Sequence, residues 1–174
     1  MLTKTISCGV HMTEYFGMPR TLQDLISAVE SRAVLFTKRA KSELSSVPFK
    51  VPEKEFQVEA VIITAAELGF QGFCLPTGRD MIVAAEQRDL ICGPHDFAFR
   101  LCLESCSGFQ ILGADLNVFS EPFAGTQNES RMLFDVKNCP SVMRGFRDAL
   151  DCQVVGKPHF TMGPSGQYAF IRRK

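Results

Sequence analysis

The chain has 174 residues, of which 45% are hydrophobic and 22% are charged, and its formal net charge is zero. This length and balance predict a single globular domain over residues 1–174. A neutral chain has no overall field to attract long nucleic acid or an anionic membrane, and no apolar run approaches the roughly 18 residues of a membrane-spanning helix.

The cysteines bear on the compartment and on metal binding. There are seven, an odd number, and no two of them form a Cys-x-x-Cys pair. This pattern indicates neither a disulfide framework nor a zinc site. The first residues of the chain lack the long apolar run of a signal peptide. We therefore expect a cytoplasmic protein in a reducing compartment that uses no metal and no cofactor.

In the N-terminal part, residues 3–16 are typical of a strand or a tight pair of strands. Thr21 and Asp24 form a capping box, which predicts that a helix begins there. Apolar residues recur at helical spacing as far as Phe36, so we expect the helix to continue past it. Three cations are then expected at its solvated carboxyl end, where they suit the helix dipole: Lys38, Arg39 and Lys41.

The middle of the chain contains one ambiguous segment and one clear helix. The apolar positions of residues 56–68 match a helix, although the β-branched run 61–64 would also form a strand. We favour the helix for this segment. Thr77 and Asp80 make a second capping box, which predicts a helix over residues 79–89.

The C-terminal half is predicted to be rich in strands. Residues 97–104 place apolar side chains at alternate positions, which favours a strand in a hairpin with residues 109–119. His95, just before this segment, is interpreted as a loop histidine. The remaining expected elements are a loop over 120–131, a strand over 132–136, a helix beginning at Pro140, and adjacent strands over 153–162 and 168–172. Together these elements predict an α+β fold: a mainly antiparallel sheet of five to seven strands with two to four helices packed against it.

Two of the three histidines occur in the same short pattern, His-x-Thr. The first is His11-Met12-Thr13 and the second is His159-Phe160-Thr161. Residues i and i+2 of a strand face the same side, so each histidine would share a face with its threonine. If the two strands are neighbours in one sheet, one imidazole can accept a proton while the other donates one, and the hydroxyls can hold an anionic oxygen. Such a site suits in-line attack at phosphorus without a metal.

The two motifs resemble those of the 2H phosphoesterase family, which is named for paired His-x-Thr/Ser motifs. Lys157-Pro158-His159-Phe160-Thr161-Met162-Gly163 is similar to the family's Pro-His-φ-Thr-φ-Gly, where φ is apolar. Val10-His11-Met12-Thr13-Glu14-Tyr15-Phe16-Gly17 is similar to φ-His-φ-Thr-φ-x-Phe-φ-Gly, with Glu14 at an apolar position and Gly17 one place early. The resemblance implies that His11 and His159 are the acid–base pair and that Thr13 and Thr161 bind phosphate. It also implies substrates such as 2′,3′-cyclic phosphates, 2′–5′ linked oligonucleotides and related RNA ends.

These motifs predict a metal-independent phosphodiesterase that acts on a small nucleotide or an RNA end. Tyr15 or Tyr168 would stack on a base and Arg172 would add positive charge, because each lies close in sequence to a motif. A cysteine nucleophile, Cys8 beside His11, is disfavoured because it lacks a third orienting residue. The competing interpretation is a non-catalytic α+β domain that binds a ligand or a protein partner and forms a homo-oligomer. The neutral charge, the 15 phenylalanines and the lack of another catalytic signature favour this second interpretation.

Overall fold

The structure, a computed structural model, describes residues 2–8, 21–32, 34–52, 56–70, 75–105, 116–124, 130–138, 148–155 and 166–173. Within these ranges the chain forms four helices and eight strands. The helices are α1 (Leu22–Ser31), α2 (Lys38–Ser45), α3 (Gly78–Glu86) and α4 (Phe97–Ser105). The strands are β1 (Leu2–Cys8), β2 (Val34–Phe36), β3 (Phe56–Thr64), β4 (Leu90–Ile91), β5 (Leu116–Phe119), β6 (Arg131–Asn138), β7 (Asp148–Val155) and β8 (Gln167–Arg172).

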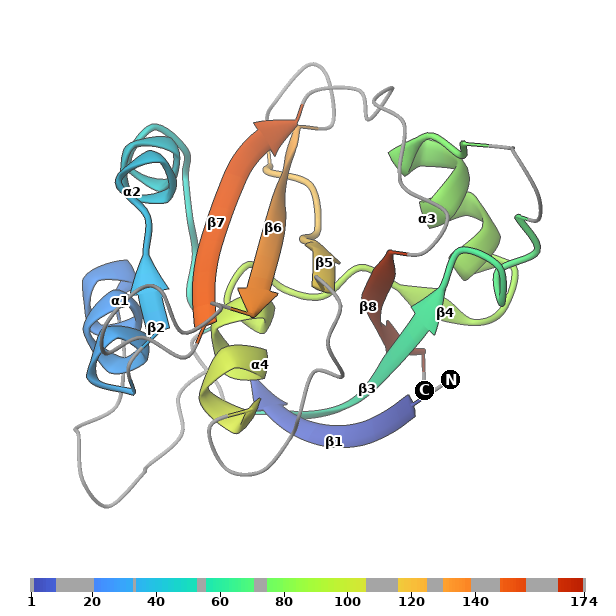
Figure 1. Cartoon of the computed structure of the whole chain (residues 1–174), viewed down its shortest axis with the longest axis horizontal. Coiled ribbons are helices and arrows are strands. Elements are labelled where there is room, and N and C mark those ends of the chain that lie inside the picture. Colours follow the sequence, from blue (N-terminus) through green and yellow to red (C-terminus); the bar gives the residue numbers. More distant parts are fainter. Residues whose placement is uncertain are drawn as a thin grey trace.

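The strands form one mixed sheet in the order β1-β3-β8-β5-β6-β7-β2, with the short β4 paired to β8 beside this row. The pairs β5–β8 and β2–β7 are parallel, and the other strand pairs are antiparallel. Helices lie against the strongly twisted sheet (Figure 1). The predicted α+β fold, with a mainly antiparallel sheet and packed helices, is therefore confirmed. No helix in the described ranges is long and apolar enough to cross a bilayer.

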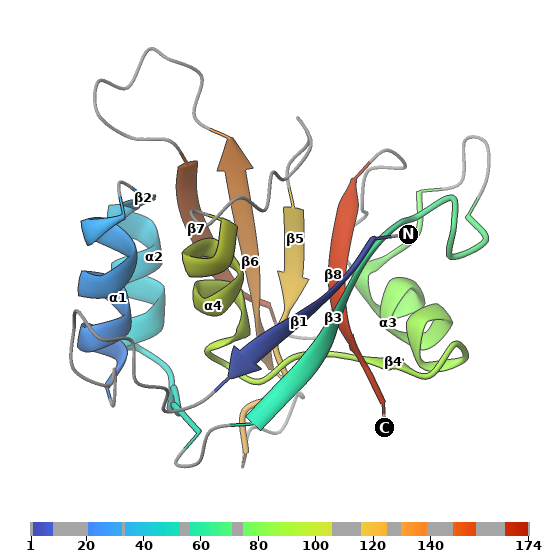
Figure 2. The same cartoon turned by 90° about the horizontal axis from the view of Figure 1, so that it is seen from below.

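Each face of the sheet carries an apolar core. Along β8, Ala169 and Ile171 enter the core that contains residues of α1, α2 and α4, whereas Tyr168 and Phe170 enter the core that contains residues of α3. The alternation follows from the strand geometry, because successive side chains point to opposite faces. Figure 2 shows the same division, with α3 on the far side of the sheet from α1, α2 and α4.

Residues 56–64 form the strand β3, so the helix expected over 56–68 is wrong. Val61 and Ile63 enter the α3-side core, while Ala60 and Ile62 enter the opposite core. A strand that is covered on both faces is apolar throughout and loses the alternation that marks a half-buried strand. The β-branched run, which also allowed a strand, therefore indicated the correct element.

Residues 97–105 form the helix α4, so the predicted strand and its hairpin are wrong. Phe97, Phe99 and Leu101 are fully buried, and so is Cys102. A helix that is buried on all sides shows no clear 3.6-residue period, so the alternating phenylalanines and leucines suggested a strand instead. In the described residues the expected partner strand is reduced to β5, which pairs with β6 and β8.

The helix expected from Thr21 past Phe36 is two helices separated by β2. The predicted capping box is present, because Thr21 Oγ1 accepts a hydrogen bond from the Asp24 backbone N–H and Asp24 accepts from the Thr21 N–H. The helix ends near Ser31, and Val34 and Phe36 are then buried on β2, which pairs with β7 in parallel. Apolar spacing alone did not reveal this interruption.

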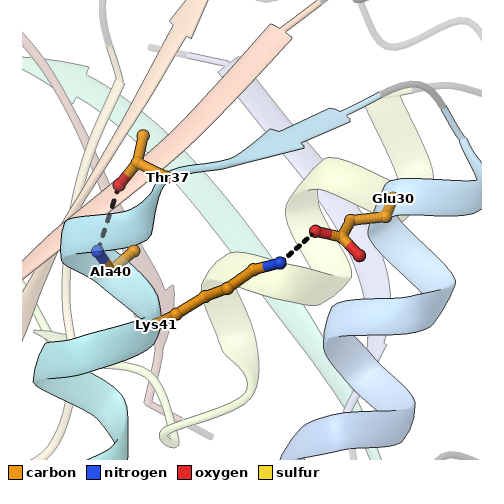
Figure 3. A network of polar contacts seen from close by, with 4 residues as sticks. All are labelled: Glu30, Thr37, Ala40 and Lys41. Carbon is orange, nitrogen blue, oxygen red and sulfur yellow. Dashed lines mark hydrogen bonds and ion pairs between the residues drawn. The ribbon is translucent and has the colours of Figure 1, made fainter.

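Lys38, Arg39 and Lys41 consequently lie in the first turn of α2 rather than at a helix carboxyl end. Cations are unfavourable at a helix amino end. Thr37 caps this end, since its Oγ1 accepts from the Ala40 N–H at 3.0 Å. Carboxylates offset the positive charge: Lys41 Nζ lies 2.7 Å from Glu30 Oε1, as Figure 3 shows, and Asp151 accepts from the Thr37 hydroxyl at 2.6 Å.

Several C-terminal predictions are confirmed and two are corrected. The second capping box, Thr77 with Asp80, begins α3, and the strands expected over 132–136 and 168–172 are found in β6 and β8. Residues 148–150, expected in a helix that begins at Pro140, instead begin the strand β7. The strand β8 lies between β3 and β5 rather than beside β7.

Candidate functional site

The residues of the two His-x-Thr motifs lie outside the described ranges. This applies to His11, Thr13 and Tyr15 near the start of the chain and to His159 and Thr161 near its end. Their assignment as catalytic and phosphate-binding residues stays a prediction.

The strands that lead into the two motifs are described, and they are not neighbours. His11 follows β1 by three residues and His159 follows β7 by four. The strands β3, β8, β5 and β6 lie between β1 and β7 in the sheet order. In Figure 1 the β1 arrow ends near the bottom of the view and the β7 arrow ends at the top. The expected pairing of adjacent strands is therefore not formed by β1 and β7.

Tyr168, expected to stack on a base, is a core residue. Its side chain is fully buried in the α3-side core, the cluster that also contains Phe170 and Leu133. Burial raises the pKa of its hydroxyl to about 12. With no surface exposed, the Tyr168 ring offers no face to a base, and its role is corrected to packing.

Arg172, expected to add positive charge to the site, already has a carboxylate partner. Its Nε donates to Glu59 Oε1 of β3 at 2.9 Å, and both side chains are partly exposed. An exposed pair of this kind contributes little to stability, but it neutralises the charge that a phosphate would need. Arg172 lies in β8, and a surface ion pair between neighbouring strands describes it better than a phosphate ligand.

The start of α4 holds a buried polar cluster that the sequence did not signal. We call it the α4 cluster; it comprises His95, Asp96 and Arg100. Asp96 is fully buried and Arg100 nearly so, and Arg100 Nε donates to Asp96 Oδ2 at 3.0 Å. The two residues are four apart, the spacing at which helical side chains meet. The pair brings opposite charges into the core together, which is how charged groups are tolerated there.

The His95 ring contacts two other segments of the chain, at residues 49–50 and at Phe123. Its Nδ1 accepts a hydrogen bond from the Lys50 backbone N–H at 3.1 Å, so in this arrangement the ring carries its proton on Nε2. The ring lies against Phe49 and Phe123, with centroid separations of 5.6 and 4.6 Å. Within the described part of the chain, Nε2 has no hydrogen-bond partner of ordinary geometry. The prediction of a loop histidine is right in position, but the side chain is buried.

Burial also governs the charge state of this region. It lowers the pKa of His95, against the opposing effect of the Glu121 carbonyl and of Asp96. Burial likewise raises the pKa of Glu121, with Asp96 adding to the effect and Lys50 opposing it. A neutral imidazole with one ring nitrogen engaged and aromatic neighbours on its faces is typical of a structural histidine.

A second polar feature lies at the edge of the sheet where β7 ends. We call it the edge pair; it comprises Arg131 and Cys92. Arg131 begins β6 and is in register with Val155, the last residue of β7. Its Nη1 donates to Cys92 Sγ at 3.3 Å, and its side chain is only 8% exposed. The neighbouring Gly93 forms a bridge with Ser120, which holds this segment beside the end of β5.

Within the described ranges, no group of three or more His, Cys, Asp or Glu side chains is arranged to hold a metal ion. Cys92, Cys102 and Cys152 are not disulfide-bonded. Comparison of the chain with protein-family models, with curated proteins and with solved structures finds no match in any of the three. The function therefore has to be inferred from the chain's own residues.

Proposed function

We propose that this protein is a cytoplasmic, metal-independent phosphodiesterase that acts on a small nucleotide or an RNA end. The observation that carries this function is the repeated His-x-Thr motif, with His11 and His159 as the acid–base pair and Thr13 and Thr161 as phosphate ligands. One imidazole would remove a proton from water or a 2′-hydroxyl, and the other would protonate the leaving oxygen.

The sheet topology sets a strict condition for this function. The strand pairings make β1 and β7 run in the same sense, so both motifs follow strands that end at the same edge. Five strand spacings of about 4.8 Å separate the two strands, which is about 24 Å along the row before the twist of the sheet separates their ends further. Three residues beyond Cys8 reach at most about 10 Å and four beyond Val155 about 14 Å. The two histidines meet only if both segments extend toward each other along this edge.

The test is hydrolysis of 2′,3′-cyclic nucleotides in the presence of a chelator. We expect the wild type to show a bell-shaped pH dependence of kcat/KM, because one histidine must be protonated and the other neutral. His11→Ala and His159→Ala should each lower kcat/KM by about 10²-fold or more. His95→Asn is the matched control, since it alters the third histidine, keeps an acceptor for the Lys50 N–H, and should retain activity. Equal rates in His159→Ala and wild type would eliminate this function.

The separation of β1 from β7 favours a second candidate, the non-catalytic domain that binds a ligand or a protein partner and forms a homo-oligomer. Light scattering coupled to size exclusion would give the oligomeric state. A dimer or larger assembly with no turnover across a panel of cyclic nucleotides would support this candidate over the enzyme.

A further inference from the structure

The Arg131 guanidinium is buried, and no carboxylate in the described part of the chain pairs with it. Within the described residues its side chain has one polar contact, from Nη1 to the Cys92 thiol, and no ion pair in that part of the chain includes it. Its Nε is fully shielded from solvent and has no hydrogen-bond partner there. The other nearly buried arginine, Arg100, has the Asp96 carboxylate at 3.0 Å. The two arginines have similar burial and differ in whether a described carboxylate balances the charge.

The Cys92 thiol does not supply the missing negative charge. Burial raises the pKa of Cys92 to about 11, although Arg131 acts in the opposite sense, so the group is an uncharged thiol at neutral pH. Glu86, an exposed residue of α3, influences Cys92 but forms no ion pair with Arg131 in the described structure. Buried charges in proteins are normally paired, because a lone charge removed from water is strongly unfavourable. An anion bound at this position would remove that imbalance.

The Nε–Nη2 side of the guanidinium suits an oxyanion. One N–H of Nη1 is directed at Cys92, and the N–H groups of Nε and Nη2 point in parallel on the other side of the planar group. Such a fork matches two oxygens of a phosphate group with two parallel hydrogen bonds. The thiol would hold the guanidinium plane in place while the fork receives the ligand.

We propose that Arg131, positioned by Cys92, anchors a binding site for a phosphate group at the sheet edge where β7 ends. The site stands on Arg131 and Cys92 alone. Its assignment to the phosphate of a substrate rests on the proposed function and on the chain path, since His159 follows β7 by four residues and Arg131 is in register with the last residue of that strand. Four residues of chain reach about 14 Å at most, which is the upper limit on the distance between His159 and the end of β7.

Thermal unfolding with inorganic phosphate as the probe tests the site, with sodium chloride at equal ionic strength as the reference. We expect the Tm of the wild type to rise with phosphate concentration, because a ligand that binds only the folded state stabilises it. Arg131→Met should lose this response and, without phosphate, should have a Tm equal to or above that of the wild type, because a buried unbalanced charge has been removed. Arg172→Met is the matched control and should keep the full response, since Arg172 is already paired with Glu59.

Three results would overturn the site: no phosphate response in the wild type, an undiminished response in Arg131→Met, or a lower Tm for Arg131→Met without phosphate. The last result would mean that the contact with Cys92 is purely structural. Arg131→Lys is a second test of the fork, because it keeps the charge without the fork and should show a weakened response.

Hydrolysis and phosphate binding separate the two proposals. If His159→Ala and the wild type respond equally to phosphate but no cyclic nucleotide is hydrolysed, the phosphate site is supported and the phosphodiesterase function is refuted. If hydrolysis occurs and Arg131→Met retains both activity and phosphate response, the phosphodiesterase function is supported and the phosphate site is refuted.

Discussion

The buried pair Asp96–Arg100 and the surface pair Glu30–Lys41 have similar lengths, 3.0 and 2.7 Å, but opposite surroundings. In the first pair the side chains are 0% and 8% exposed, and in the second 39% and 47%. If length decided the energy, breaking either pair would have the same effect. If burial decides it, Arg100→Met should be far more destabilising than Lys41→Met.

Removing one partner of a buried pair leaves an uncompensated charge in the core and costs about 3–5 kcal/mol. Breaking an exposed pair costs about 0–1 kcal/mol, because water and salt already screen it. The larger cost is a substantial part of the roughly 5–15 kcal/mol by which a domain is usually stable. We therefore expect Arg100→Met to lower the urea midpoint strongly and Lys41→Met to change it little.

The assay is equilibrium urea unfolding at pH 7, with the slope m compared between variants so that midpoint shifts can be read as free energies. The double variant Asp96→Asn/Arg100→Met should recover part of the loss, because neither position of this pair then carries a charge. This corresponds to a coupling free energy at the upper end of about 0.5–3 kcal/mol. Equal losses for Arg100→Met and Lys41→Met, or strict additivity in the double variant, would refute the reasoning.

Two further predictions concern the segment before α4. A Cβ at Gly93 would lie 2.3 Å from Phe97 Cδ1 in the core, so Gly93→Ala should lower the free energy of unfolding by about 1–3 kcal/mol in urea; an unchanged midpoint would contradict this packing. Burial lowers the pKa of His95, so as the pH falls this histidine takes up a proton in the unfolded chain before it does so in the folded protein. The free energy of unfolding is therefore unaffected by His95 above about pH 6.5 and decreases as the pH falls below that value. The raised pKa of Glu121 has the opposite effect on the free energy of unfolding, in more acidic solution. The measurement is the urea midpoint of the wild type and of His95→Asn from pH 7.5 to 5. The midpoint of His95→Asn should decline less steeply with falling pH than that of the wild type.

Local signals in the sequence predicted local structure well. The capping boxes at Thr21 and Thr77 fix where α1 and α3 begin, because both hydrogen bonds of each box form within four residues. The strands β6 and β8 were also predicted. Where an element is buried on every side, the pattern failed: β3 has buried apolar residues on both faces, and residues 97–102 of α4 are all buried, so neither element shows its own period.

The tertiary arrangement could not be read from the same signals. The strand β2 pairs with β7 more than 100 positions along the chain, and only the finished sheet shows that Phe36 ends a strand rather than continuing a helix. Arg100 and Arg131 are ordinary arginines in the sequence, and burial alone distinguishes them from surface cations. The His-x-Thr motifs predicted a chemistry, whereas the separation of β1 from β7 is a property of the topology.

The position of β8 in the sheet bears on how the chain reaches its native state during biosynthesis. This strand comes last among those described, yet it lies inside the row, between β3 and β5, with Tyr168, Ala169 and Phe170 fully buried. Both halves of the sheet are translated before the strand that joins them. Until the ribosome has released β8, two strand edges and their apolar side chains lack a partner, which is the condition under which nascent chains recruit chaperones or aggregate.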